Sequence, residues 1–243
     1  GSSEIYGGSV ETQNAAENGD VGVSMSIDFY GYLTQSRNPD CEYIVPEGQS
    51  IVNGDPIAIP NTSTQKLLAE EFLDFVLSAE GQALWLNDDL RRMPVMREAF
   101  DVPGVTGVED LYSAFNQTTS TIGIDFNDTL SLSMNRAFIK YFESVFTDAH
   151  AELVTCWMAI VNAYDEARIT IGEFNAYCDL MGAMISIIDP KTSLSEEFTI
   201  AYAMAMNNDM ISDSSYASTV QSRWTIAAKL QYQSVAAAVN AET

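Results

Sequence analysis

Apolar residues recur every three or four positions along most of residues 134–241, a spacing that places them on one face of an α-helix. Proline at position 190 interrupts the pattern, because it lacks the N–H that a helix interior needs. The stripes are Met134, Phe138, Tyr141, Phe142 and Val145; Leu153, Trp157, Ile160, Val161 and Tyr164; and Phe174, Tyr177, Met181, Met184 and Ile188. With two further helices predicted over residues 195–207 and 218–241, the second half of the chain is expected to form a helical bundle or cap.

The first half has a different pattern, in which strands are predicted. Over residues 21–29 apolar side chains alternate strictly with Gly, Ser and Asp, which predicts a strand with one buried face. Three short strands are predicted at residues 42–45, 51–52 and 57–59.

Three helices are also predicted in this half. Ser9 is expected to cap the first, over residues 9–17. The second follows the polar residues 61–64 and carries an apolar stripe of Leu68, Phe72, Phe75 and Val76. Ser78 is expected to cap the third, which contains Trp85.

Residues 101–129 are rich in Gly, Asp, Ser and Thr and show little sustained periodicity, so the internal boundary is placed there. We therefore predict an α/β region over residues 1–118 and an α-helical region over residues 119–243. The chain as a whole is expected to be rich in helix.

Charge limits the classes of partner. The chain has 34 acidic and 11 basic residues and a formal net charge of −23. Such an excess repels phosphate backbones and anionic membrane surfaces, so neither nucleic acid nor an anionic lipid surface is an expected partner. It favours solubility in a salty or extracellular habitat.

Three motifs at close spacing resemble one family. They are GDPIAIP at residues 54–60, an amphipathic helix with AEEFLDFVLS at residues 69–78, and EGQ at residues 80–82. RMPV at residues 92–95 and the run from Gly8 to Val23 are similar to flanking segments of the same family. Together they resemble the carboxy-terminal part of the extracellular solute-binding proteins of ABC-type importers, which have the type 2 periplasmic-binding fold.

The resemblance implies two α/β lobes hinged around a ligand cleft, binding without covalent chemistry or a cofactor, and delivery of a small-molecule solute to an ABC permease in the membrane. It also implies an extracellular or periplasmic location, with a membrane anchor on the native full-length protein. The likeness starts late in the family's sequence, so a missing N-terminal lobe on the same native chain is an expected partner. The helical second half exceeds what most members carry.

Candidate ligand-binding residues come from two places. Asp28, Tyr30 and Tyr32 would share one face of the predicted strand and its continuation, where hydroxyls and a carboxylate converge on a solute; a solvated strand face is the alternative. Trp85 could stack on a sugar and Arg92 could pair with an anionic solute, although a core position for Trp85 and local ion pairs for Arg92 remain open. No metal site is predicted.

Other chemistry-bearing residues have ordinary interpretations as well as functional ones. Cys156 and Cys178 could bridge two helices or remain buried thiols. His150, beside Asp148, could act as an acid–base pair or as a helix-end contact. Residues 207–215 could hold calcium, but an acidic loop is favoured because the calcium-loop spacing is missing.

Two rival functions remain beside solute binding. The first is a structural or interaction module, derived from a solute-binding protein, that has lost its cleft. The second is an enzyme, which would require a turnover that depends on Asp28 or His150. The sequence specifies neither the solute nor the permease.

Overall fold

The computed structural model describes residues 4–52, 54–120 and 123–242. They form two compact units, and each is considered by itself: the first is Tyr6–Phe126, and the second is residues 127–242 together with Glu4 and Ile5. The chain is helix-rich, as expected, with ten α-helices and one pair of short strands among the described residues. No helix in that part of the chain combines the length and apolar character needed to cross a membrane.

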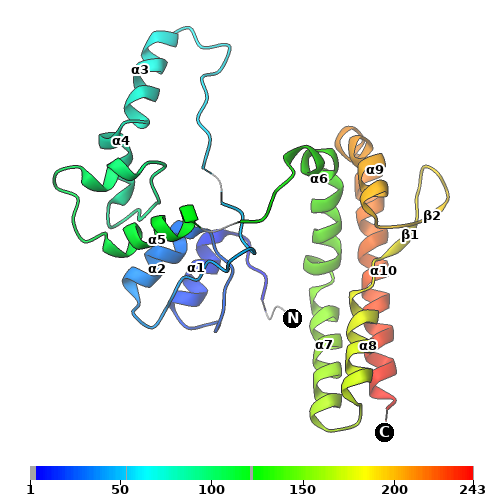
Figure 1. The fold of residues 1–243 in the computed structure, drawn as a ribbon. Helices are drawn as coiled ribbons and strands as arrows, with labels where there is room; N and C mark the ends of the chain where they lie inside the picture. Colours follow the sequence, from blue (N-terminus) through cyan, green and yellow to red (C-terminus); the bar gives the residue numbers. More distant parts are fainter. Residues whose placement is uncertain (1–3, 53, 121–122, 243) are drawn as a thin grey trace. The chain divides into compact units, whose positions relative to one another are not determined.

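The second unit is built from antiparallel helices (Figure 1). Helices α6 (Asp128–Phe142) and α7 (His150–Asp165) follow one another through a π-helical turn, Glu143–Thr147. Helix α9 (Ile200–Ser212) packs on α6, and the long α10 (Ser214–Asn240) packs on α7. Helix α8 (Ile171–Gly182) fills the space against α7 and α10.

A large apolar core holds this unit together. Trp224, Ile160 and Val220 are fully buried, and Tyr141 stacks on Phe198 with ring centroids 3.7 Å apart. The helices predicted from the first two stripes are confirmed as α6 and α7. Burial of such side chains supplies most of the stability of a helical bundle.

The two predicted helix boundaries on either side of Pro190 are wrong. The third stripe does not continue to Ile188, because α8 ends at Gly182 and Ser186–Ile188 forms strand β1. Ser195–Glu197 forms strand β2, which pairs antiparallel with β1, and α9 begins only at Ile200. Backbone pairing across this hairpin replaces the helical hydrogen bonds that the periodicity suggested.

The first unit contains α1 (Ser9–Glu17), α2 (Asp28–Arg37), α3 (Lys66–Val76), α4 (Ala79–Ala83) and α5 (Glu109–Ser120), with 3₁₀ turns at Leu84–Leu86 and Arg97–Asp101. Its core is small: Tyr32, Leu86, Ala99, Val108 and Leu111 are buried, and partly buried apolar residues surround them. The first helix is as predicted in extent, but its N-cap is Gly8 rather than Ser9.

The strand predicted over residues 21–29 is wrong. Residues 23–27 are irregular, and Val23 is 90% exposed, so the alternation has no face to bury. Helix α2 begins at Asp28, with an acidic residue in its first turn and Arg37 in its last, which suits the helix dipole. The short strands predicted at residues 42–45, 51–52 and 57–59 are also absent from the described part of the unit.

Residues 101–129, for which no helix was predicted, contain α5 over Glu109–Ser120. Its buried Leu111 belongs to the core, together with the partly buried Ala114. Asp, Ser, Thr and Asn lower intrinsic helix propensity, and packing overrides it here.

The motif-bearing helices are joined tightly. Ser78 caps α4 as predicted, accepting a hydrogen bond from the Gly81 N–H at 3.1 Å. Gly81 must lack a side chain, because a Cβ there would lie 2.0 Å from the Phe75 carbonyl oxygen. Buried Gln82 donates to the Val76 carbonyl at 2.7 Å and accepts from the Val95 N–H at 2.9 Å. The EGQ and RMPV motifs thus meet through one amide side chain.

Candidate functional site

A hollow of about 280 Å³ lies beside α2 and α5 in the first unit. Helix α2 contributes Tyr32 and Gln35, the segment after it contributes Glu42, Tyr43 and Val45, and α5 contributes Asp110, Ser113, Ala114, Gln117 and Thr118. This volume is at the small end of ligand pockets, where metabolite-sized solutes bind. The lining combines aromatic rings with hydroxyl, amide and carboxylate groups, a mixture that suits a small polar solute.

Tyr43 is held in place by two features of α2. The Gln35 side-chain oxygen accepts a hydrogen bond from the Tyr43 N–H at 3.0 Å. A Cβ on Gly31 would lie 2.1 Å from Cδ2 of the Tyr43 ring, so only glycine lets that ring lie against the helix. The ring meets Tyr32 edge-on, with centroids 5.0 Å apart. Two aromatic walls at a fixed angle therefore bound the hollow.

The tyrosine hydroxyls of the hollow stay protonated at neutral pH. Burial, together with the neighbouring Tyr43 and Asp28, raises the pKa of Tyr32 to about 12, against a lowering by the Thr118 hydrogen bond. Burial and Asp28 also raise the pKa of Tyr43. A negative charge nearby disfavours a second one, so both hydroxyls remain neutral groups able to donate a hydrogen bond.

The carboxylates at the hollow differ in their partners. Asp110 forms an ion pair with the buried guanidinium of Arg91, which also lies 3.9 Å from Asp88. Arg91 reaches this position from a left-handed backbone, with φ of 47°. Glu42 is exposed and has no lysine or arginine in ion-pair contact within the described part of the chain.

A second cluster brings together Arg92 and Trp85, two of the residues predicted to bind ligand. The Arg92 guanidinium lies 3.8 Å from the centroid of the Phe29 ring and 5.5 Å from that of Trp85. Its Nη1 is 3.2 Å from a carboxylate oxygen of Asp55, which belongs to the GDPIAIP motif. The guanidinium is already paired and stacked, so this cluster is a half-buried platform rather than a pocket.

The predicted site residues are therefore divided between two places. Tyr32 lines the hollow, and Asp28 influences its electrostatics. Tyr30 contacts Phe29, with ring centroids 4.2 Å apart, and so adjoins the Arg92 platform. The strand face that was to unite Asp28, Tyr30 and Tyr32 does not form, because these residues lie on α2, where positions two apart point in different directions.

Sequence reasoning missed Tyr43, Gly31 and the α5 residues of the hollow. The pair Glu42-Tyr43 was assigned to a short strand, and no helix was predicted where α5 lies. The spacing of Leu111, Ala114 and Thr118 at three and four residues was the available signal for α5. The tight contact of Gly31 with Tyr43 joins residues twelve apart, which no local pattern reveals.

The other residues considered for calcium binding, a disulfide or acid–base chemistry lie within or at the ends of secondary-structure elements or are free thiols. Asp213 caps α10, and Asp209 pairs with Lys191 at 2.7 Å, so residues 207–215 form helix ends rather than the acidic loop that was favoured. The described residues contain no cluster of His, Cys, Asp and Glu suited to a metal ion. Cys41, Cys156 and Cys178 are free thiols, and His150 is the first residue of α7.

Comparison with known proteins gives one match. Residues 6–110 match the family described as bacterial extracellular solute-binding proteins, which confirms the resemblance inferred from the motifs. Searches of curated proteins and of solved structures gave no match. The matched segment spans α1 to α4 and ends at Asp110, within the first turn of α5. This part of the chain thus carries the signature of a family that binds solutes outside the cell for bacterial transport.

Proposed function

We propose that this chain takes part in extracellular solute binding for an ABC-type importer, and that the hollow beside α2 and α5 is its contribution to the ligand cleft. The observation that carries the proposal is the family match over residues 6–110. The hollow supports it, because aromatic walls and neutral hydroxyls are what a polar solute needs for reversible binding. Binding proceeds without covalent chemistry.

The rest of the cleft is supplied, in this proposal, by a further lobe of the native chain, and closure of the lobes presents the solute to a membrane permease. The native protein is extracellular or periplasmic and held at the membrane by an anchor. The type 2 periplasmic-binding fold describes the complete receptor, of which residues 1–118 form the carboxy-terminal part and residues 119–243 a helical extension.

A thermal-shift screen of sugars, amino acids, oligopeptides, anions and metal ions tests the proposal. A solute that binds only the folded state raises the melting temperature in proportion to its occupancy. We expect a saturable rise of the melting temperature with one solute class, lost in Tyr43→Ala, since that change removes one wall of the hollow. Tyr30→Ala is the matched control, because it truncates a neighbouring tyrosine outside the hollow.

Three outcomes separate the alternatives. Loss of the shift in Tyr43→Ala alone supports the hollow. Loss in Tyr30→Ala alone assigns binding to the Arg92 platform instead. The absence of any saturable shift contradicts solute binding by this chain and favours the second candidate function, an interaction module without a cleft. The exposed apolar face of α3, which has no buried residue, is the observation that favours that alternative.

A further inference from the structure

The hollow carries a charge pattern that selects among solutes. Glu42 contributes a carboxylate without a basic ion-pair partner in the described part of the chain, and no lysine or arginine is among the described residues that line the hollow. Asp110 lines it too, with Arg91 already bound to its Oδ2. The remaining polar groups are hydroxyls and amides. The lining is thus negative overall and offers no cation to an anionic solute.

The aromatic walls of the hollow also favour a positively charged solute. Tyr32 and Tyr43 meet edge-on with ring centroids 5.0 Å apart, and both line the hollow together with Glu42. A ring face attracts a cation through its quadrupole, and the attraction grows when the cation is partly removed from water. Protonated hydroxyls and amide oxygens accept hydrogen bonds from an ammonium group. An aromatic corner next to an unpaired carboxylate is therefore complementary to an organic cation.

The raised pKa values of Tyr32 and Tyr43 agree with a negative electrostatic potential in the hollow. After burial, the negative Asp28 is among the groups that raise the pKa of both Tyr32 and Tyr43. A field that opposes ionisation of a phenol also stabilises a positive charge in its place. Asp28 therefore adds to Glu42 and Asp110 in the electrostatics of the hollow.

We infer that the hollow beside α2 and α5 binds a small organic cation, a solute bearing an ammonium group, with the Glu42 carboxylate and the rings of Tyr32 and Tyr43 as its recognition elements. This inference rests on the proposed function and narrows its solute class. The volume of about 280 Å³ limits the cation to the size of a single small metabolite.

Matched solutes test the charge requirement. Putrescine, butanediol and succinate share a four-carbon chain and differ in charge, and choline can be compared with the neutral isostere in which carbon replaces its nitrogen. Each solute is titrated into the full chain at physiological salt, and binding is measured by calorimetry. We expect saturable binding of putrescine or choline, and no binding of butanediol, succinate or the choline isostere. Binding of butanediol, succinate or the choline isostere as tightly as the cations would overturn the inference.

Glu42→Gln and Glu47→Gln separate the site from the general charge of the protein. Both remove one carboxylate from the same exposed stretch, but Glu47 does not line the hollow. We expect Glu42→Gln to weaken cation binding about fivefold, the effect of one exposed charge pair, and Glu47→Gln to leave it nearly unchanged. Equal effects of the two changes would mean that the net charge of −23 attracts cations without a site.

The outcomes also distinguish this inference from the proposed function. If a sugar or another neutral solute binds and Tyr43→Ala abolishes its binding, the receptor function stands and the cation inference falls. If cations bind but Tyr43→Ala leaves their affinity unchanged, the inference falls as well. If no solute of any class binds, both fall together.

Discussion

Four hydrogen bonds converge on the carboxylate of Asp189, which is 1% exposed, at the turn between β1 and β2. The hydroxyls of Tyr202 and Tyr216 each donate to Oδ2 at 2.6 Å, and the N–H groups of Lys191 and Thr192 donate to Oδ1 at 2.7 and 2.9 Å. A buried charge persists only when it is satisfied in this way. Asp189 therefore connects the hairpin to α9 and α10.

These contacts predict a stability change at acid pH. Burial alone would raise the pKa of Asp189, but the hydrogen bonds from Tyr202, Tyr216 and the backbone outweigh it and lower the pKa from 3.8 to about 2. The folded state then favours the ionised form, so its contribution is present above the unfolded pKa and is lost as pH falls toward the folded one. That contribution is about 2 kcal/mol.

The measurement is urea unfolding of the wild type and Asp189→Asn, followed by circular dichroism at about pH 5 and about pH 2. Because Asn cannot titrate, we expect the stability difference between the two proteins to shrink by about 2 kcal/mol at the lower pH. The other carboxylates are common to both proteins and cancel. An unchanged difference would show that the Asp189 hydrogen bonds do not favour its ionised form.

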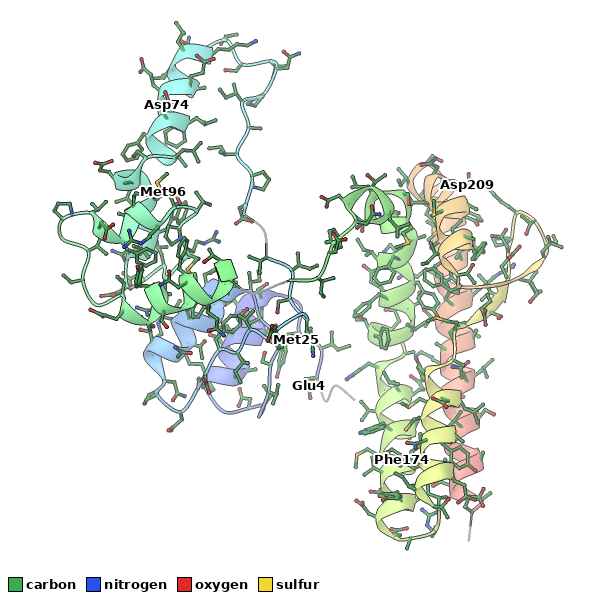
Figure 2. The ribbon with its side chains drawn as sticks, viewed as in Figure 1. Glu4, Met25, Asp74, Met96, Phe174 and Asp209 are labelled. Carbon is green, nitrogen blue, oxygen red and sulfur yellow. The ribbon has the colours of Figure 1, made fainter. Side chains whose placement is uncertain are left out.

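At the scale of elements, α3 is amphipathic but has no buried residue. Phe72 is 60% exposed and Leu68 63%, while Asp74 extends from the same helix (Figure 2). The predicted helix is confirmed, but no residue of its apolar stripe is buried. An apolar stripe in a sequence predicts a helix and a surface to be covered, without saying what covers it.

This exposure predicts a small effect of substitution. Phe72→Ser should lower the free energy of unfolding by at most about 0.5 kcal/mol, since the ring buries little surface in this chain. Leu111→Ala, in α5, is the contrasting change: its side chain is fully buried, and the loss should be about 2 to 5 kcal/mol. Denaturant unfolding of the two variants and the wild type measures both free-energy changes. A loss above about 2 kcal/mol for Phe72→Ser would mean that the stripe is covered.

The elements also show which parts of the fold the sequence could predict. The long apolar stripes gave α6 and α7 correctly, because helical hydrogen bonds are local and a bundle buries the stripe. The alternation over residues 21–29 misled, because a strand forms only when another strand pairs with it. Helix α5 was missed because its propensity is weak and Leu111 is buried by residues distant in sequence.

For the candidate site too, the sequence indicated residues with a local signal and missed those brought in by tertiary contacts. Tyr32 was singled out as a ligand-binding residue on the premise of a strand, and it lies on α2, where it lines the hollow. Trp85 and Arg92 were expected separately and lie together, since the 3₁₀ turn at Leu84–Leu86 places Trp85 near the RMPV motif. Tyr43 and α5 enter the hollow through tertiary contacts alone.

At the scale of the whole molecule, the family signature and the hollow lie in the first unit, while the larger core lies in the second. The formal charge of −23 surrounds both units with counterions, and at physiological salt its influence decays over about 8 Å. Selectivity for a solute must therefore come from groups in direct contact with it, and in the proposed function these groups are the residues that line the hollow.

The measurement that tests this account most directly is heteronuclear NMR of the full chain, titrated with the solute that raises its melting temperature most. The account predicts that shifted backbone amides concentrate in residues 28–45 and 109–118, the segments around the hollow. Tyr43→Ala should remove those shifts while leaving the spectrum of the helical unit unchanged. Shifts concentrated in residues 128–240, with the hollow unaffected, would contradict it.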